Sequence, residues 1–448
     1  MAMGSAPDQA PLAPPLWQQL QACAQALQAV LQGRNHAQAL SLVEVRLRPA
    51  AQALLFAVLR QWGRTLALKK ILVQRQPSAP ANALLCTGLA LLVPSAQAMY
   101  PSHTLVSQLV EAVKRQASTQ AQAAFVNACV RRFLREQDAL MAQTDSVPSA
   151  RWNVPTWWME RVRQDHPDHW QTILQNSQQA APMTIRVNQR LISRDALQAA
   201  WAAQGVMADA VGTHGLVLHQ AKPVHVLPGF EQGWWSVQDL AAQSAAPLLL
   251  TGLQPRDGHS LKLLDACAAP GGKTAHLLEI ADAQVTALDV DAQRCQRIHD
   301  NLARLQLRAD VVVADAAQPS SWWTGQAFDG ILLDAPCTAS GIVRRHPDIP
   351  WLRRAGDVAG LASQQKALLE ALWPLLAPGG RLLYCTCSLF ASEGRDQIQT
   401  FLANNKQARL LPSVGPFLPG VISQVDSVAD NPDHDGFFYA LLERQPDA

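Results

Sequence analysis

Residues Leu261–Thr274 read LKLLDACAAPGGKT, and this stretch decides the fold of the C-terminal half of the chain. Its first half is an apolar run typical of a buried strand, and its second half is a Pro-Gly-Gly turn before the helical sequence AHLLEIA. Gly271 and Gly272 would allow the positive φ and close backbone approach of a ligand-binding turn, and the helix start favours a negative group. A plain surface turn is the alternative.

Two familiar nucleotide-binding motifs do not fit this stretch. The ending GGKT resembles G-x-x-x-x-G-K-[ST], but Cys267 stands where a phosphate-binding P-loop has its first glycine. The dinucleotide fingerprint G-x-G-x-x-G is missing from it as well. What remains is a glycine turn at the carboxyl end of the first strand of an α/β sheet, the edge where such sheets bind ligands.

An apolar run that ends in an acid recurs downstream. Asp289 follows QVTAL, Asp315 follows ADVVVA and Asp334 follows GILL, so that with Asp265 four predicted strands end in carboxylates. Each acid could instead cap the next helix, and for Asp315 both interpretations stay open. Asp289 lies about 20 residues beyond the glycine turn, the spacing at which an acid accepts hydrogen bonds from a ribose.

The composition indicates a globular protein of several domains. A chain of 448 residues exceeds one ordinary core, and its residues are 48% hydrophobic and 16% charged. The eight cysteines show no framework spacing, and no signal peptide is expected, which favours a reducing cytoplasm. The apolar run Leu84–Val93 is too short to span a bilayer.

The N-terminal part is expected to be helical and basic. A disordered tail, residues 1–15, precedes an all-α domain, residues 16–143, in which apolar residues recur at helical spacing. Residues 1–150 contain 13 Lys and Arg against 6 Asp and Glu, whereas the remainder contains 24 against 29. A basic face would bind a phosphate backbone by releasing counterions, or it is a solvated helical face. Its basic residues are Arg46, Arg48, Arg60, Arg64, Lys69, Lys70, Arg75, Lys114, Arg115, Arg131, Arg132 and Arg135.

Two further segments complete the chain. Residues 144–150, TDSVPSA, have the composition of a linker. Residues 151–230 are expected to form a small α/β connecting module, and residues 231–448 the α/β ligand-binding domain. The module's predicted elements are a helix at 157–178, a strand at 184–188, a helix at 192–205 and a strand at 215–219.

Three motifs, CAAPGGKT, DAPCTASG and YCTCSL, occur in this order. Together they resemble the motifs of RNA 5-methylcytosine methyltransferases. From about Leu40 to Glu443 the chain is similar to the Sun/RsmB family, bacterial enzymes that methylate a cytosine of small-subunit (16S) ribosomal RNA. The resemblance implies a multidomain protein with a NusB-like RNA-binding domain, the connecting module and a Rossmann-like class I methyltransferase domain. It also implies S-adenosylmethionine as cofactor, ribosomal RNA as partner, and a cytoplasmic monomer without membrane association.

Methylation of C5 of a pyrimidine calls for a nucleophile, because that carbon becomes reactive only after addition at C6. A thiolate suits this task. Cys337 in DAPC and Cys387 in TCS each follow a predicted strand, with Cys267 and Cys385 close by in the sequence motifs. A cysteine that only packs in the core is the alternative for each. The spacing does not decide which one attacks.

The resemblance assigns roles to these residues. RNA enzymes of this kind use the Thr-Cys cysteine, which implies Cys387 as the nucleophile and Cys337 as the residue that assists release. Asp334 would hydrogen-bond the cytosine near N3 and lie near the methionine of the donor. Asp289 would hold the ribose and Asp315 would lie by the adenine. The rest of the implied donor pocket is Cys267, Ala268, Ala269, Pro270, Gly271, Gly272 and Lys273.

Some matches to the family are weaker. The family often has an acid followed by Asn after the TCS loop, whereas this chain has Glu393 followed by Gly394. The sequence RVN at 186–188 matches a module that helps seat RNA, although Arg186 and Asn188 could be ordinary strand-end residues. The roles of Gln238 and Asp239 in GWWSVQDLAAQ stay open.

The sequence GIVRRHPDIPWLRR follows the DAPC loop and predicts contacts with RNA. Arg344, Arg345 and His346 would hold phosphates, and Trp351 would stack on a splayed base. The target cytosine would come from a loop or be flipped out of a duplex. A charged loop with a core tryptophan is the alternative interpretation.

Two other functions are alternatives to an RNA methyltransferase. A zinc deaminase needs P-C-x-x-C, but Pro336-Cys337 is followed by Thr-Ala-Ser, so this match fails. A non-catalytic RNA-binding assembly factor would not need the two cysteines and Asp334. No metal site is expected, although a zinc site built from Cys267, Cys337, Cys385 and Cys387 is conceivable.

Overall fold

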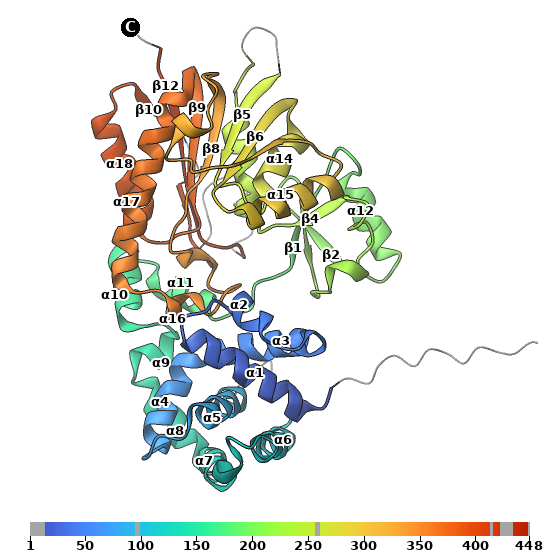
Figure 1. Ribbon diagram of the computed structural model, residues 1–448, viewed down its shortest axis with the longest axis vertical. Coiled ribbons are helices and arrows are strands. Elements are labelled where there is room, and N and C mark those ends of the chain that lie inside the picture. The colour runs from blue at the N-terminus through green and yellow to red at the C-terminus, as the bar shows by residue number, and fades with distance from the viewer. Residues whose placement is uncertain (1–13, 95–98, 256–259, 413–414, 422–432, 447–448) are drawn as a thin grey trace, which may run out of the picture. The chain divides into compact units, whose positions relative to one another are not determined.

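A computed structural model describes residues 14–94, 99–255, 260–412, 415–421 and 433–446 (Figure 1). The chain divides into two compact units. Residues 1–159 form the first unit together with residues 346–352, and the rest of the chain forms the second. Most of the expected disordered tail, residues 1–13, lies outside the described residues.

The first unit is helical throughout its described residues, which confirms the expected helical region. In α1 the residues Leu20, Cys23, Leu27 and Val30 are buried at helical spacing, as an amphipathic helix requires. α5 is buried on almost every side and lies in the core of the unit. The helices are α1 (Leu16–Leu31), α2 (His36–Ser41), α3 (Arg48–Leu59), α4 (Trp62–Leu72), α5 (Ala79–Leu92), α6 (Ser102–Lys114), α7 (Ala123–Arg135), α8 (Gln137–Asp145), α9 (Pro148–Trp152) and α16 (Ile349–Leu352).

The segment with linker composition, residues 144–150, is helical instead. It contains the end of α8 and the start of α9, which begins at Pro148. Proline is favoured in the first turn of a helix, where its missing N–H has no helical partner to lose. Thr144 is fully buried and accepts a hydrogen bond of 2.8 Å from Nη1 of Arg64. Serine and proline are common at helix starts as well as in linkers. The composition of this segment therefore did not distinguish the two, and the linker prediction was wrong.

The second unit begins with a small α/β part. Its four strands form an antiparallel sheet in the order β2-β3-β1-β4, and two of them, β2 and β4, were not predicted. The predicted helix at 157–178 is two helices, α10 and α11. Trp201 and Trp235 pack edge to face in its core, 5.5 Å between ring centroids. The elements are α10 (Thr156–Asp165), α11 (Trp170–Ser177), β1 (Thr184–Val187), α12 (Arg194–Ala202), β2 (Ala208–Val211), β3 (Gly215–Leu218) and β4 (Trp235–Val237).

A mixed sheet forms the rest of the second unit. Its strand order is β10-β12-β9-β8-β5-β6-β7, and β11 pairs with β12. β5 to β9 are parallel where they pair, whereas β10, β11 and β12 pair antiparallel. The strands are β5 (Leu261–Ala266), β6 (Ala283–Asp289), β7 (Asp310–Val313), β8 (Phe328–Asp334), β9 (Leu376–Thr386), β10 (Ala408–Leu410), β11 (Gly415–Phe417) and β12 (Phe437–Arg444).

The order of the parallel strands locates the ligand-binding edge. β5 pairs with β6 on one side and with β8 on the other, so the chain order reverses at β5. In open α/β sheets, ligands bind at the carboxyl ends of the strands at such a reversal. The glycine turn after β5 and the DAPC loop after β8 meet at this edge, as the sequence predicted.

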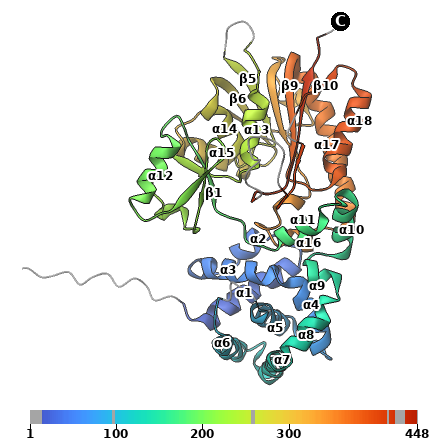
Figure 2. The same ribbon diagram turned by 180° about the vertical axis from the view of Figure 1, so that it is seen from behind.

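Helices cover both faces of this sheet (Figures 1 and 2). Neighbouring residues on one strand pack into different cores: Leu263 joins the core with α13, α14 and α15, whereas Leu264 joins the core with α17 and α18. This alternation is the period of a strand buried on both faces. The helices are α13 (Ala245–Leu250), α14 (Gly272–Ile280), α15 (Ala292–Arg304), α17 (Ala355–Leu372) and α18 (Arg395–Asn404).

All eight cysteines are free. Cys23 and Cys86 lie in the helical core, where burial raises the pKa of their thiols to about 12 and about 11. Thiols of this kind pack and do not react. No helix among the described residues is long and apolar enough to cross a membrane.

Candidate active site

The turn after β5 has the strained backbone of a ligand-binding loop. Cys267 has a φ of 62° and Gly271 one of 93°. A Cβ at Gly271 would lie 3.1 Å from a methyl carbon of Ile298, so both space and φ require glycine there. Gly272 does not have a positive φ, and the expectation was wrong for this residue, which opens α14. The N–H of Ala268 donates to the Leu288 carbonyl at 3.0 Å and ties the turn to β6.

Asp265, near the end of β5, is fully buried. Its Oδ2 accepts a hydrogen bond of 2.5 Å from Oγ1 of Thr274, whereas its Oδ1 has no hydrogen-bond partner among the described residues. Burial raises the pKa of this carboxyl to about 7. The end of β5 therefore carries one buried oxygen, next to the turn, that a ligand could satisfy.

Asp289 lies at the end of β6, and each of its two carboxylate oxygens accepts a hydrogen bond from a main-chain N–H group. Its Oδ2 accepts from the N–H of Ala269 at 3.1 Å, and its Oδ1 accepts from the N–H of Asp291 at 3.1 Å. The guanidinium of Arg294 lies 3.6 Å away. Each carboxylate oxygen has lone pairs left for a ligand. The expected ribose contact of Asp289 stays a prediction.

Asp315 lies two residues beyond the end of β7 and organises its own loop. Its carboxylate accepts from the N–H of Ala317 and from Nε2 of Gln318, both at 2.9 Å. This is the local capping that was the alternative to a ligand contact. Because its side chain is partly exposed, the expected contact with adenine stays a prediction.

Lys273 and Asp334 form an ion pair at the sheet edge. The Nζ of Lys273 donates to Oδ2 of Asp334 at 2.6 Å and lies 5.4 Å from the centre of the Phe437 ring. Burial by itself would lower the pKa of Lys273, but the Asp334 carboxylate more than offsets this and the pKa is raised. Only 12% of the lysine side chain is exposed, so it is not a solvated residue at a helix start.

Two of the four cysteines near this edge are poor nucleophiles. Cys385, on β9, is fully buried and its Sγ donates to Oδ1 of Asp334 at 3.5 Å. Burial and this carboxylate raise the pKa of its thiol well above the usual value. Burial, with Asp334 and Asp289, raises the pKa of Cys267 to about 12. Both residues therefore remain thiols at neutral pH.

Cys337 and Cys387 lie together on neighbouring loops. Their Sγ atoms are 3.5 Å apart, and both side chains are partly exposed. The loops follow β8 and β9, and the N–H of Gly341 donates to the Cys387 carbonyl at 2.9 Å. The hydrogen bond with Cys387 and burial raise the pKa of Cys337 well above its usual value. The structure thus brings two partly exposed sulfur atoms together, and the raised pKa keeps Cys337 a thiol at neutral pH.

Comparison with known proteins identifies this arrangement. The family model of the 16S rRNA methyltransferase RsmB/F matches residues 250–443, and a ferredoxin-like domain model of RsmF/B-like methyltransferases matches residues 154–225. Ribosomal RNA small subunit methyltransferase B of Vibrio cholerae is 39% identical over 434 residues, which cover 95% of this chain and 97% of that protein. The chain belongs to the RsmB/F family of 16S rRNA methyltransferases.

Other comparisons agree with the RsmB/F assignment. The Escherichia coli protein of the same name is 41% identical over 76% of this chain and 78% of its own. The crystal structure of PH0851 shares the fold with a TM-score of 0.74 at 24% identity, over 96% of this chain and 99% of that one. NSun6 from Pyrococcus horikoshii with SFG matches 65% of this chain and 99% of its own with a TM-score of 0.55 at 21% identity. The protein is therefore an S-adenosylmethionine-dependent RNA methyltransferase, which confirms the expected reaction class and cofactor.

The RsmB/F chain pairs two arginines that were expected on RNA with carboxylates, and one of them is buried. Arg344 is 2% exposed, and it pairs with Asp435 at 2.7 Å and with Asp433. Arg345 pairs with Asp435 and, at 2.8 Å, with Asp239. These ion pairs stabilise the loop after the DAPC motif. The prediction of phosphate contacts was wrong for Arg344 because its carboxylate partners neutralise and cover it.

His346 and Trp351 belong to the helical unit. The ring of His346 stacks on that of His36, 4.9 Å between centroids, and Nδ1 of His36 lies 3.1 Å from Asp348. Ligand atoms of these three residues lie within 4.8 Å of one another, as in a metal site, but hydrogen bonding already accounts for the arrangement. Trp351 packs against the helical core, so the alternative of a core tryptophan holds rather than stacking on a base.

Arg186 is a structural residue and not an RNA contact. It is 1% exposed, and its guanidinium donates to both carboxylate oxygens of Glu279, at 2.7 and 2.8 Å. It also donates to Oε1 of Gln238 and, at 3.0 Å, to the carbonyl of Gly272 at the start of α14. Asn188 is equally buried and donates to the Gly233 carbonyl. Through Arg186, the connecting module thus contacts the start of α14, which directly follows the glycine turn.

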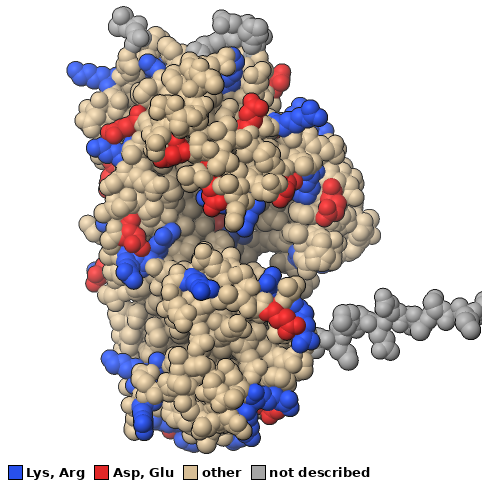
Figure 3. All heavy atoms as spheres, in the orientation of Figure 1, with Lys and Arg blue, Asp and Glu red and all other residues tan. Residues whose placement is uncertain are grey.

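The basic residues of the helical unit do not form one continuous surface of unpaired positive charge. Figure 3 shows Lys and Arg atoms in separate groups on this unit. Lys70 and Arg75 are exposed. Several other arginines pair with carboxylates, which reduces their attraction for phosphate: Arg46 with Glu44, Arg64 with Asp145, Arg115 with Glu111, and Arg132 and Arg135 with Glu136.

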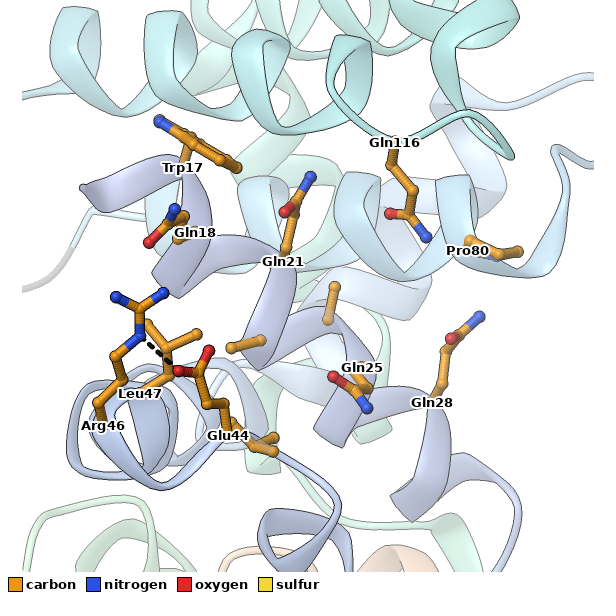
Figure 4. Close-up of a pocket in the computed structure, with 13 residues that line it drawn as sticks. Trp17, Gln18, Gln21, Gln25, Gln28, Glu44, Arg46, Leu47, Pro80 and Gln116 are labelled. Carbon is orange, nitrogen blue, oxygen red and sulfur yellow. Dashed lines mark ion pairs between the residues drawn. The ribbon is translucent and has the colours of Figure 1, made fainter. Parts of the chain in front are cut away.

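A pocket of about 600 Å³ in the helical unit is lined by Trp17 and a row of glutamines from α1 (Figure 4). Nε2 of Gln21 donates to the Ala112 carbonyl at 2.8 Å, and Nε2 of Gln25 donates to the Leu42 carbonyl at 3.2 Å. These amides tie helices together. None of the predicted catalytic or cofactor-binding residues lines this pocket.

Proposed function

We propose that this RsmB/F protein transfers a methyl group to C5 of a cytosine in 16S ribosomal RNA through a covalent adduct with Cys387. The observation that carries the proposal is the 3.5 Å separation of the Cys337 and Cys387 sulfur atoms at the ligand-binding edge of the sheet. One sulfur can bond the base while the other handles a proton.

The residues at the edge fit S-adenosylmethionine, which supplies an electrophilic methyl group when bound. Oδ1 of Asp265 is a buried acceptor that needs a donor, and Gly271 gives the turn a positive φ that side-chain-bearing residues rarely adopt. Asp289 offers free lone pairs beside the same turn. We assign the donor pocket to residues 267–273 with Asp289, Asp315 and Asp334.

Cys387 begins the reaction on the base. Its thiolate adds to C6, the C5=C6 bond opens, and the electron pair makes C5 nucleophilic. Asp334, with 31% of its side chain exposed, hydrogen-bonds the cytosine edge near N3.

Cys337 completes the reaction. Once Cys387 is bonded to carbon, it can no longer hold the proton of Cys337 through their shared hydrogen bond, which is the largest cause of the raised pKa. Cys337, which is partly exposed, can then give its proton to water and, as a thiolate, remove the proton from C5. The electron pair re-forms C5=C6, and the Cys387 sulfur leaves as a thiolate.

The roles of the two cysteines can be distinguished with variants. Each variant is incubated with 16S RNA and S-adenosylmethionine, methylation is measured, and covalent protein–RNA complexes are detected on a denaturing gel. Cys387→Ala should abolish methylation and every covalent complex. Cys337→Ala should accumulate a protein–RNA adduct that survives denaturation, because attack remains and release fails. Cys129→Ala, in the helical core, is the matched control and should behave as the wild type.

A trapped adduct in Cys387→Ala and none in Cys337→Ala would reverse the two roles. Methylation of transfer RNA but not of 16S RNA would show that the proposed substrate is wrong.

We further propose that the helical domain is the NusB-like RNA-binding part of the enzyme, in agreement with the exposed Lys70 and Arg75.

A further inference from the structure

Glu393 ends the short 3₁₀ helix η9 (Ala391–Glu393) and is fully buried. Its carboxylate accepts four hydrogen bonds. The N–H of Thr338 donates at 2.9 Å and the Thr338 hydroxyl donates to the other oxygen. Oγ of Ser388 donates at 2.5 Å and Nε2 of Gln365 at 3.2 Å. A carboxylate suits this place because it only accepts, and four donor groups of three residues point at it.

The donors flank the two proposed reactive cysteines. Thr338 follows Cys337 directly, and Ser388 follows Cys387 directly. On the other side of Cys337, Nε2 of Gln365 also donates to the carbonyl of Pro336 at 2.9 Å. One carboxylate therefore contacts both cysteine loops, and its partner Gln365 holds the first loop from the opposite side.

The main chain of Glu393 contributes a second set of bonds. Its carbonyl accepts from Oη of Tyr384 at 2.7 Å and from Oγ1 of Thr386 at 3.4 Å. Thr386 precedes Cys387, so Glu393 contacts the residues on both sides of this cysteine. The two loops also bind each other, since the N–H of Leu389 donates to Oγ of Ser340 at 2.7 Å.

We propose that Glu393 is a positioning residue that fixes the Cys337 and Cys387 sulfur atoms at their working distance. This inference rests on the proposed cysteine chemistry. Four hydrogen bonds replace the water that this buried carboxylate has lost. Because they come from both cysteine loops and from Gln365, they hold the two loops to one geometry. Side chains that react in sequence on one base need that geometry within a fraction of an ångström.

The first variant is Glu393→Gln, which keeps the shape of the side chain. Its amide oxygen can accept from the Thr338 N–H, but its NH₂ group must then face hydroxyls that donate in the wild type. We expect kcat for methylation to fall by about 100-fold, as a displacement of about 1 Å does. The KM for RNA and the affinity for S-adenosylmethionine should stay within about twofold. Glu370→Gln, an exposed residue of α17, is the matched control and should retain wild-type kcat.

The second readout measures the cysteine spacing without methylation. Phenylarsine oxide joins two neighbouring thiols and releases one water, and the bridged peptides are detected by mass spectrometry. The wild type should be bridged between Cys337 and Cys387, and Cys337→Ala should not. In Glu393→Gln and Glu393→Ala the bridging rate should fall by about tenfold, whereas a purely stabilising residue would lower the melting temperature and leave this rate unchanged.

Folded Glu393→Gln and Glu393→Ala proteins with wild-type bridging and wild-type kcat would overturn the proposal. If Glu393→Ala does not fold, Thr338→Val removes one donor at nearly constant volume and decides in its place. If Cys387→Ala methylates normally, the proposed chemistry fails, yet the bridging rate still decides whether Glu393 holds the two loops.

Discussion

The Nζ of Lys273 lies 2.6 Å from Oδ2 of Asp334, and this ion pair joins the start of α14 to the end of β8. Lys273 stands in the first turn of α14, directly after the glycine turn, and Asp334 ends β8 before the DAPC loop. The other oxygen of Asp334 accepts from the Cys385 thiol. A single carboxylate therefore links the start of α14 to β9, the strand that leads into the Cys387 loop.

Lys273→Met should lower the free energy of unfolding by about 2 kcal/mol, less than for a fully buried pair because Asp334 is partly exposed. The raised pKa of Lys273 means that its contribution is complete below the unfolded-state value of about 10.4 and is lost as pH rises through the folded-state value. The difference from wild type should therefore be constant from about pH 6 to about pH 9 and shrink above about pH 10.5. Thermal unfolding at several pH values measures it. The exposed Lys366→Met is the control, and an equal loss there would contradict the prediction.

Asp265→Asn should stabilise the protein at pH 8. The folded-state pKa of Asp265 is raised to about 7, so the unfolded chain releases this proton first and stability falls as pH rises from about 4 to about 7. The amide does not ionise, and its oxygen can still accept from Thr274. We expect a gain of at most about 4 kcal/mol at pH 8 that disappears near pH 4. Thermal unfolding without ligand tests this, with the exposed Asp310→Asn as control; a gain that does not depend on pH would refute the argument.

Asp289→Ala should weaken binding of S-adenosylmethionine by about tenfold, the effect of one lost charged hydrogen bond. Titration calorimetry of the purified protein measures the affinity. Asp291→Ala, at the N-cap of α15, is the matched control: it should cost about 1 kcal/mol of stability and leave the affinity within about twofold. Tight binding of ATP without affinity for S-adenosylmethionine would contradict the donor pocket.

The double variant Lys70→Gln/Arg75→Gln should reduce the salt dependence of RNA binding. Each phosphate contact contributes about 0.7 to 0.9 to the slope of log K against log salt concentration, so the slope should fall by about 1 to 2. Binding titrations at several salt concentrations give this slope. Arg46→Gln removes an arginine already paired with Glu44 and should change it less. Equal slopes for wild type and double variant would show that these two residues are only solvated.

The sequence predicted the residues at the sheet edge because their signals are local. A strand followed by a glycine turn, and apolar runs that end in Asp289 or Asp334, fix their own positions at the carboxyl edge. The positions of the two cysteine loops could be predicted for the same reason, because each loop comes directly after a strand. Their separation of 3.5 Å did not follow, because it depends on Glu393, which lies far along the chain from Thr338.

The predictions failed where a charge has a distant partner. Arg344 was expected on RNA, and for Arg186 an RNA contact was one of two interpretations. Their partners Asp435 and Glu279 lie 91 and 93 residues away in the sequence. Composition and spacing do not reveal such pairs. Glu393 was noted only as a retained acid, and the hydroxyl residues Thr338 and Ser388 beside the cysteines were the one local sign of its role.

The short segment of residues 346–352 belongs to the helical unit, although Arg345 and Arg353 on either side belong to the other unit. A gene fragment that ends at residue 159 would encode the helical unit without α16 and would leave the core that packs Trp351 open to water. The packing of this segment against the helical core also limits which exchanges between related genes can give a stable protein. A recombination that exchanged only the first 159 codons between two relatives would give a hybrid in which the segment after the DAPC loop must match foreign helices, so the two parts of this enzyme are expected to be inherited together.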